Sequence, residues 1–229
     1  MILMTYNIMH GLDYLKLLQK ERIIDLDKIS QVIKQYNPDI LALNEVYNDL
    51  EGINQAAYLA KKLGYKYYYF GKSLNLSDYL HYGNAILSKE EIINPETIKI
   101  EDAKTHDEDV YYESRIIIKA QIKDYNVFVS HFGLAKTEQH NAITKMKELI
   151  KNVDNIIFMG DLNIDEKEMP IIDNKLINTS EGKGLLTFPS INPQKKIDYI
   201  YISNNNKIND VKVGHQVASD HLPVIVNIN

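Results

Sequence analysis

The chain begins with apolar runs that alternate with amphipathic segments. Residues 1–8 and 39–46 are almost continuously apolar, which is typical of strands that are buried on both faces. Residues 26–36 carry apolar side chains at helical spacing, and residues 52–63 form a second helical stretch that ends before Gly64. This part of the sequence therefore predicts the order strand, helix, strand, helix.

The rest of the chain is richer in strands. β-branched and aromatic runs predict successive strands, arranged as antiparallel hairpins, at residues 65–71, 82–89, 92–100, 111–122 and 126–131. Helices are predicted at residues 137–153 and 165–174, with further strands at residues 155–159, 196–203, 208–214 and 222–228. Strands outnumber helices, and the helices fall between pairs of strands. The pattern therefore predicts layers of sheet covered by helices and differs from a plain βαβ repeat.

Composition indicates an ordinary globular protein. Of the 229 residues, 45% are hydrophobic and 25% are charged, which is enough to bury a large core without cross-links. The 6 prolines and 10 glycines are scattered, so we expect one domain spanning residues 1–229. The chain has no cysteine, which excludes disulfides, thiolate catalysis, iron–sulfur clusters and cysteine-containing zinc sites.

The charge balance is acidic, with 26 basic and 31 acidic residues giving a net charge of −5. Proteins that grip long nucleic acid by its backbone usually carry a basic face, so this balance argues against an extended duplex interface. A locally positive active site remains compatible with it, above all with a bound metal ion. No apolar run is long enough for a membrane span, and no signal peptide is visible. We therefore expect a cytoplasmic protein, and a monomer.

Polar side chains recur at the ends of the apolar strands. They are Asn7, Glu45, His131, Asp161 with Asn163, Asp198, and Asp220 with His221. Each has a local explanation, such as a cap, a turn or a core histidine. Strand ends form the functional crevice in layered α/β proteins, and a carboxylate after an apolar strand must be solvated, paired or metal-bound. As a set, these residues therefore predict one polar site.

The fragments TYNIMHG, DILALNEV, YGNAILS, VSHFGL, MGDLNID, KKIDYIYIS and SDHLPV resemble, in this order, the endonuclease/exonuclease/phosphatase family. The resemblance runs from Asn7 to Pro223, and the combination of GDLN with a later SDH-x-P is specific. It implies the α/β fold of DNase I, a four-layered α/β/β/α sandwich with two packed mixed β-sheets flanked by helices. It also implies a site at one edge of the two sheets.

The resemblance further implies a role for each residue of the site. Glu45 would be the main ligand of a Mg²⁺ or Mn²⁺ ion, with Asn7 beside it and Asp220 near the metal. Asp161 would polarise or deprotonate the attacking water, and Asn163 would orient that water and touch the phosphate.

Four more residues would surround the phosphoryl group. His221 would contact the phosphoryl oxygens, held by a hydrogen bond to Asp198. His131 would stand as a second histidine on the leaving-group or phosphate side, and Arg115 matches a frequent family arginine near the substrate.

The chemistry supports this interpretation independently of the resemblance. Hydrolysis of a phosphodiester needs an in-line nucleophile and neutralisation of the phosphoryl oxygens, and carboxylate and amide oxygens suit Mg²⁺ or Mn²⁺. The sequence thus predicts a metal-dependent hydrolase of phosphate esters, with phosphodiesters, including nucleic acid, as the expected substrates. Two alternatives stay open. One is a phosphomonoesterase or a phosphoesterase of lipid or metabolite head groups, and the other is a binding protein that kept the fold.

The sequence departs from the family pattern after Asn7. Many family members have an acidic or amide side chain two positions later, where this chain has Met9 followed by His10. His10 either takes over as a ligand or substrate contact or lies in a surface loop, and we expect the surface loop. Close kinship with AP endonucleases is not supported, because Lys195 and Lys196 stand where those enzymes often carry Trp-Arg.

Overall fold

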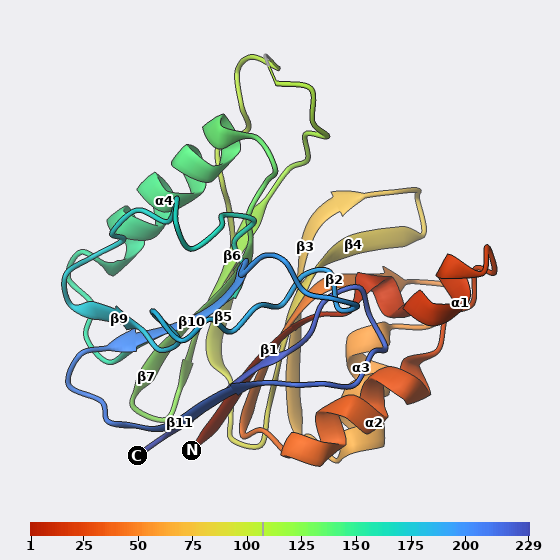
Figure 1. The fold of residues 1–229 in the computed structure, drawn as a ribbon, viewed down its shortest axis with the longest axis horizontal. Helices are drawn as coiled ribbons and strands as arrows, with labels where there is room; N and C mark the ends of the chain where they lie inside the picture. Colours follow the sequence, from red (N-terminus) through yellow and green to blue (C-terminus); the bar gives the residue numbers. More distant parts are fainter. Residues whose placement is uncertain (107) are drawn as a thin grey trace.

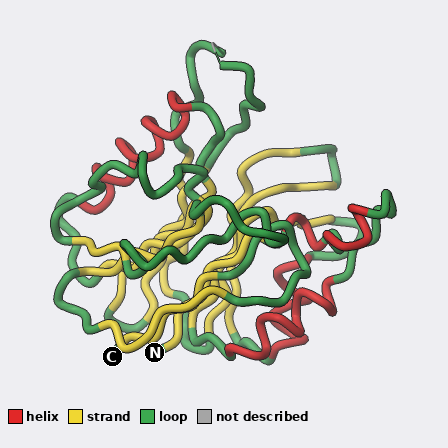
Figure 2. The backbone as a smooth tube through the Cα atoms, in the orientation of Figure 1, coloured by secondary structure: helices red, strands yellow, loops and turns green. Residues whose placement is uncertain are grey.

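The protein consists of two six-stranded β-sheets packed face to face, with helices on both outer faces (Figure 1). The computed structural model describes residues 1–106 and 108–229. Both chain ends lie on the same side of the molecule, and the strands form its middle (Figure 2).

The first sheet has the strand order β11-β12-β1-β2-β4-β3. Its strands are β1 (Ile2–Asn7), β2 (Ile40–Asp49), β3 (Tyr67–Asn75), β4 (Leu80–Ser88), β11 (Ile208–Val213) and β12 (Val224–Ile228). β1 and β2 run parallel, with Asn7 opposite Asn44, and the other neighbouring strands are antiparallel. The ends of β1 and β2 therefore meet at one edge of the sheet.

The second sheet has the strand order β5-β6-β7-β8-β10-β9. Its strands are β5 (Ile93–Lys99), β6 (Ile116–Ile122), β7 (Tyr125–His131), β8 (Ile156–Asp161), β9 (Leu176–Asn178) and β10 (Asp198–Ser203). β7 and β8 run parallel, with His131 opposite Asp161, and the remaining pairs are antiparallel. Both sheets are thus mixed, as predicted.

Helices on the two outer faces complete the four layers. α2 (Leu26–Tyr36) and α3 (Gln55–Leu63) cover the first sheet, and α4 (Lys136–Ile150) covers the second (Figure 1). A single 3-10 turn, η1 (Met9–Gly11), and the short helix α1 (Tyr14–Leu18) follow β1. The predicted α/β/β/α sandwich is confirmed. Within the described residues, the helices are too short or too polar to cross a membrane.

Apolar side chains fill the three spaces between the four layers. The cluster between the two sheets includes Ile86, Ile118, Val129 and Met159, all of which are fully buried. Two further clusters join the first sheet to α2 and α3, and the second sheet to α4. Each central strand is therefore buried on both faces, which explains its continuous apolar sequence.

Two of the predicted elements need correction. The helix expected at residues 165–174 is wrong, because the chain there makes turns in which the Asp165 carboxylate accepts from the Lys167 N–H. Pro170, which has no N–H to donate, stands in the middle of that segment. The strand expected at residues 111–122 begins only at Ile116, and the residues before it run along the candidate site.

Candidate active site

Glu45 enters the site from a bulge in β2. The register between β2 and β4 shifts between Leu43 and Val46, and Glu45 has a positive φ of 55°. A bulge changes the direction in which a side chain leaves the strand. The Glu45 side chain is 21% exposed and lines a cavity of about 300 Å³. Burial raises its pKa, and the hydrogen bond from Asn7 opposes that shift.

Asn7 links the carboxylates of the two sheets. Its Nδ2 donates to Glu45 Oε1 at 3.1 Å and to Asp161 Oδ2 at 3.0 Å, while its Oδ1 accepts from the Met9 N–H at 3.0 Å. The amide nitrogen of Asn7 therefore faces both carboxylates, and its oxygen faces the backbone of η1.

Asp161 lies at the end of β8, where its side chain is only 1% exposed. The preceding Gly160 allows this placement, because a Cβ at that position would lie 1.8 Å from the Ser130 carbonyl oxygen. This close approach of β7 and β8 explains the Gly-Asp pair in the sequence. Burial raises the pKa of Asp161 to about 7, and the charge of His221 opposes the rise.

His221 and Asp198 form a buried pair beside Asp161. Asp198 starts β10 directly opposite Asp161, and its Oδ2 lies 2.8 Å from His221 Nδ1. His221 Nε2 lies 3.6 Å from Asp161 Oδ2. Burial lowers the pKa of His221, but the charges of Asp198 and Asp161 outweigh burial and raise the pKa to about 10. His221 is therefore an imidazolium at neutral pH.

His131 stands on the other side of Asp161 and is neutral. Burial, followed by the charge of Arg115, lowers its pKa well below the usual value. Arg115 Nη1 lies 2.9 Å from His131 Nδ1, and because a guanidinium only donates, Nδ1 is the acceptor. The ring proton then sits on Nε2, which lies 3.4 Å from Asp161 Oδ2.

The structure brings the predicted site residues together around one cavity. Seven of them line it, namely Glu45, Arg115, His131, Asp161, Asn163, Asp220 and His221. Asn7 and Asp198 contact these residues from the buried side. Asp220 sits at the rim, where its Oδ1 accepts from Ser219 Oγ at 3.1 Å. The roles assigned to these residues stay predictions.

Sequence reasoning missed Asn44, which ties the two sheets together beneath the site. Its Nδ2 donates to Asn84 Oδ1 at 2.9 Å and to the Ser130 carbonyl at 3.1 Å. Its Oδ1 accepts from the backbone N–H of Asp161 at 2.9 Å. An amide inside an otherwise apolar strand is the signal that could have identified it.

The expected surface position of His10 is wrong. Its side chain is 22% exposed and lines the same cavity as Glu45. The imidazole stacks on Tyr47 with ring centroids 4.6 Å apart, and its Nδ1 lies 3.2 Å from Glu45 Oε2. Burial and the charge of Arg22 lower its pKa to about 4.

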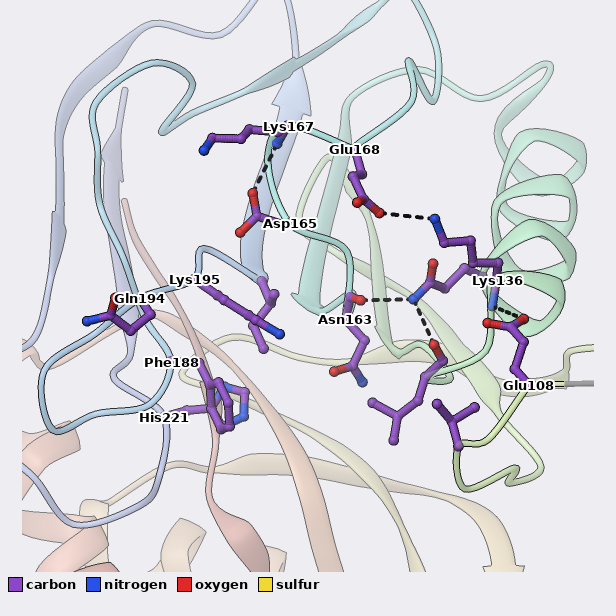
Figure 3. A pocket seen from close by; sticks show the side chains of 14 residues that line it. Glu108, Lys136, Asn163, Asp165, Lys167, Glu168, Phe188, Gln194, Lys195 and His221 are labelled. Carbon is purple, nitrogen blue, oxygen red and sulfur yellow. Dashed lines mark hydrogen bonds and ion pairs between the residues drawn. The ribbon is translucent and has the colours of Figure 1, made fainter.

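A second cavity of about 720 Å³ adjoins the first (Figure 3). The two cavities share Leu134, Asn163, Phe188 and His221. The larger cavity has a mixed polar lining. It carries the lysines Lys136, Lys167 and Lys195, the glutamines Gln139 and Gln194, and the acidic residues Glu108, Asp165 and Glu168. One of the lysines, Lys136, pairs with Glu168 at 3.4 Å. Phe188 packs against His221 with ring centroids 4.8 Å apart and so forms a wall between the cavities.

The donor set of the site fits a divalent metal ion. Ligand atoms of Asp161, Asp198 and His221 lie within 4.8 Å of one another. Two members of that group, His221 and Asp198, already pair with each other through Nδ1 and Oδ2. A different pair of ligand atoms, Glu45 Oε2 and His10 Nδ1, belongs to residues that line the cavity. Carboxylate oxygens with a neutral imidazole form a suitable site for a divalent cation.

The two packed sheets with helices on both outer faces are the DNase I-like hydrolase fold. Residues 4–221 match the sequence model of the Endonuclease/Exonuclease/phosphatase family, and the chain belongs to this family. Its members are generally phosphoesterases and typically depend on divalent metal ions. The comparison with curated proteins finds no match.

Solved structures share the fold at low sequence identity. An endonuclease/exonuclease/phosphatase from Beutenbergia cavernae is 20% identical with a TM-score of 0.78, covering 100% of this chain and 71% of its own. A mannosyl-6-phosphatase from Bacteroides thetaiotaomicron is 18% identical with a TM-score of 0.71, covering 100% and 99%. A truncated TDP2 from Caenorhabditis elegans is 20% identical with a TM-score of 0.66, covering 99% and 96%.

Proposed function

We propose that the protein hydrolyses phosphate esters with a divalent metal ion, preferring phosphodiesters, and so acts as a nuclease or phosphodiesterase. One observation carries the proposal. The buried Asp161 Oδ2 has side-chain nitrogens of Asn7, His131 and His221 within 3.6 Å. Residues of both sheets thus orient a single carboxylate toward a cavity that can hold a phosphoryl group.

Asp161 and the residues around it have separate roles in the proposed hydrolysis. Asp161 accepts the proton of the attacking water at its carboxylate, and a pKa of about 7 suits a general base at neutral pH. His221, held by Asp198, offers a fixed positive charge to the phosphoryl oxygens. Arg115, held by Glu113 at 2.9 Å and by His131, faces the same cavity as a second cation.

Glu45 would hold the divalent ion, Mg²⁺ or Mn²⁺, with Asn7 and Asp220 beside it. When bound, such an ion supplies Lewis-acid stabilisation of the phosphoryl group and lowers the pKa of bound water. The Asn7 amide nitrogen donates one hydrogen to Glu45 and the other to Asp161, and so keeps the two carboxylates apart. Their roles therefore remain separate, although both carboxylates face the same cavity.

The adjoining cavity of about 720 Å³ supports a diester substrate. A diester carries an organic group on each side of the phosphorus, and the two joined cavities offer space on both sides of Asn163 and His221. Lys167 and Lys195 at the larger cavity add positive charge for an anionic group beyond the scissile bond (Figure 3).

A phosphomonoesterase acting on a sugar phosphate is the second candidate. The larger cavity carries Gln139, Gln194 and Asp165, which are side chains that suit sugar hydroxyls. The name of the Bacteroides neighbour describes that activity for that protein.

Hydrolysis assays separate these functions. Purified protein with Mg²⁺ or Mn²⁺ would be given bis-p-nitrophenyl phosphate, p-nitrophenyl phosphate, mannose 6-phosphate, and labelled single- and double-stranded DNA and RNA. EDTA and Asp161→Asn serve as controls. We expect metal-dependent cleavage of the diesters that Asp161→Asn abolishes. Cleavage of monoesters alone would favour the second candidate, and cleavage that survives EDTA would contradict the proposed chemistry.

A further inference from the structure

His10 stands beside Glu45 in the position of a second metal ligand. We infer that His10 binds the same divalent ion as Glu45 through Nδ1, and that this mixed nitrogen and oxygen site favours Mn²⁺ over Mg²⁺. The inference rests on the proposed function, which requires a divalent ion at Glu45.

The backbone at His10 is held in one conformation. Met9 and His10 both have positive φ angles, 47° and 46°, in the turn that follows β1. The Gln55 side chain donates from Nε2 to the His10 carbonyl at 2.6 Å and accepts at Oε1 from the Tyr47 N–H at 2.9 Å. A single glutamine thus fixes His10 against the strand that carries Glu45.

Aromatic contacts hold the imidazole ring of His10. It stacks on Tyr47 with an interplanar angle of 8° and meets the edge of Tyr82 at a centroid distance of 6.0 Å. Tyr47 and Tyr82 themselves pack edge to face at 6.1 Å. Turning the ring would break this cluster, so the direction of Nδ1 is fixed before any ligand arrives.

The Nδ1 atom is buried and has no hydrogen-bond partner among the residues that the structure describes. It lies 3.2 Å from Glu45 Oε2, without the alignment of a hydrogen bond. A buried polar atom without a partner is costly, and a metal ion would satisfy it. Adjacent ligands of an octahedral ion with bonds of about 2.1 Å lie about 3 Å apart, which matches this spacing.

An imidazole ligand changes the choice of metal. Mg²⁺ strongly prefers oxygen ligands, whereas imidazole nitrogen suits transition metals, and Mn²⁺ accepts both nitrogen and oxygen. Glu45 alone would serve either ion. The addition of His10 therefore gives Mn²⁺ an advantage that a site built from oxygen alone would lack.

Calorimetric titration with MnCl₂ and MgCl₂ tests the inference without any substrate. His10→Phe keeps a ring to stack on Tyr47 but removes both nitrogens. We expect it to weaken Mn²⁺ binding at least about 10-fold, the lower range for losses around metal sites, and Mg²⁺ binding by less. His10→Gln, which offers an oxygen, should lower the ratio of Mn²⁺ to Mg²⁺ affinity. The nitrogen coupling in electron spin-echo spectra of bound Mn²⁺ should fall in both variants.

His140→Phe is the matched control, because His140 is exposed on α4, away from both cavities. It should leave both affinities unchanged, and thermal melting would show that each variant is folded. If folded His10→Phe binds Mn²⁺ as tightly as the wild type, with the nitrogen coupling intact, His10 is no ligand. Binding that Glu45→Gln abolishes would then still support the proposed function. If the wild type binds neither ion, both proposals fail.

Discussion

The two halves of the sandwich have similar topology, but the carboxylates that they contribute to the site have different surroundings. In each sheet the central strands run parallel and a helix joins them, as β1–α2–β2 in the first sheet and β7–α4–β8 in the second. Each unit delivers an acidic residue from its second strand, Glu45 at a bulge within β2 and Asp161 at the end of β8. Both carboxylates contact the same Asn7 side chain.

The two carboxylates differ in their surroundings. Glu45 lies at a bulge within its strand and keeps a partly exposed side chain. It lies next to the His10 Nδ1 atom, which has no hydrogen-bond partner among the described residues. Asp161 leaves a strand that packs too tightly for any side chain at position 160, and three nitrogen-bearing side chains enclose its Oδ2. We propose that the same topology yields one carboxylate that binds a metal ion and one that is enclosed for proton transfer. The following experiments test this division.

Asp161→Asn should have the largest effect on catalysis. It keeps the shape and most hydrogen bonds of the side chain but loses the ability to accept a proton. We expect turnover at saturating metal to fall at least about 100-fold, with metal binding largely retained. Steady-state hydrolysis of the best diester, together with calorimetric titration of Mn²⁺, would measure both. Wild-type turnover in this variant would end the assignment of Asp161 as the base.

Asn44→Ala should break the link between the halves. It removes the side chain that bonds Asn84, the Ser130 carbonyl and the Asp161 N–H, and leaves those buried groups without their partner. We expect a loss of about 2 kcal/mol in the free energy of unfolding, measured by urea denaturation. Asn209→Ala is the control, because Asn209 makes an exposed hydrogen bond to Asn229. Equal stability of both variants would show that Asn44 does not join the sheets energetically.

Glu45→Gln should act mainly on metal affinity. We expect Mn²⁺ binding to weaken at least about 10-fold, with much of the lost turnover recovered at high metal concentration. Glu51→Gln, on an exposed turn, should change neither quantity. If added metal restored turnover equally in Asp161→Asn and Glu45→Gln, the two carboxylates would not have separate roles.

The pH dependence of stability should give the smallest and most specific effect. Burial raises the pKa of Asp161 to about 7, above its value in the unfolded chain. Such a group stabilises the fold fully at low pH, and this contribution is lost as the pH rises toward about 7. In EDTA, Asp161→Asn should therefore gain in melting temperature relative to the wild type between pH 5 and pH 8. A difference that stays constant over this range would contradict the shifted pKa.

The sequence predicted the layered fold and most of the residues that meet at the site. Continuous apolar runs marked the central strands, and polar residues at their ends marked the cavity. The turn at residues 165–174 and the late start of β6 were not predictable, because helical spacing and strand propensity say little about a proline-interrupted loop or an extended segment outside a sheet. Asn44 and His10 gained their significance only from contacts with residues distant in the sequence.

What the sequence determined by itself is the alternation of buried strands and amphipathic helices and the kinds of polar group placed at the strand ends. These features follow from local spacing and from the free energy of burying apolar surface. What only the tertiary structure decided is the environment of each polar group. Burial and neighbouring charges make His221 charged and His131 neutral, and they raise the pKa of Asp161 to about 7. The fold also places His10 Nδ1 3.2 Å from Glu45 Oε2, with no hydrogen-bond partner among the described residues. All of these interactions depend on distances that exist only in the folded chain.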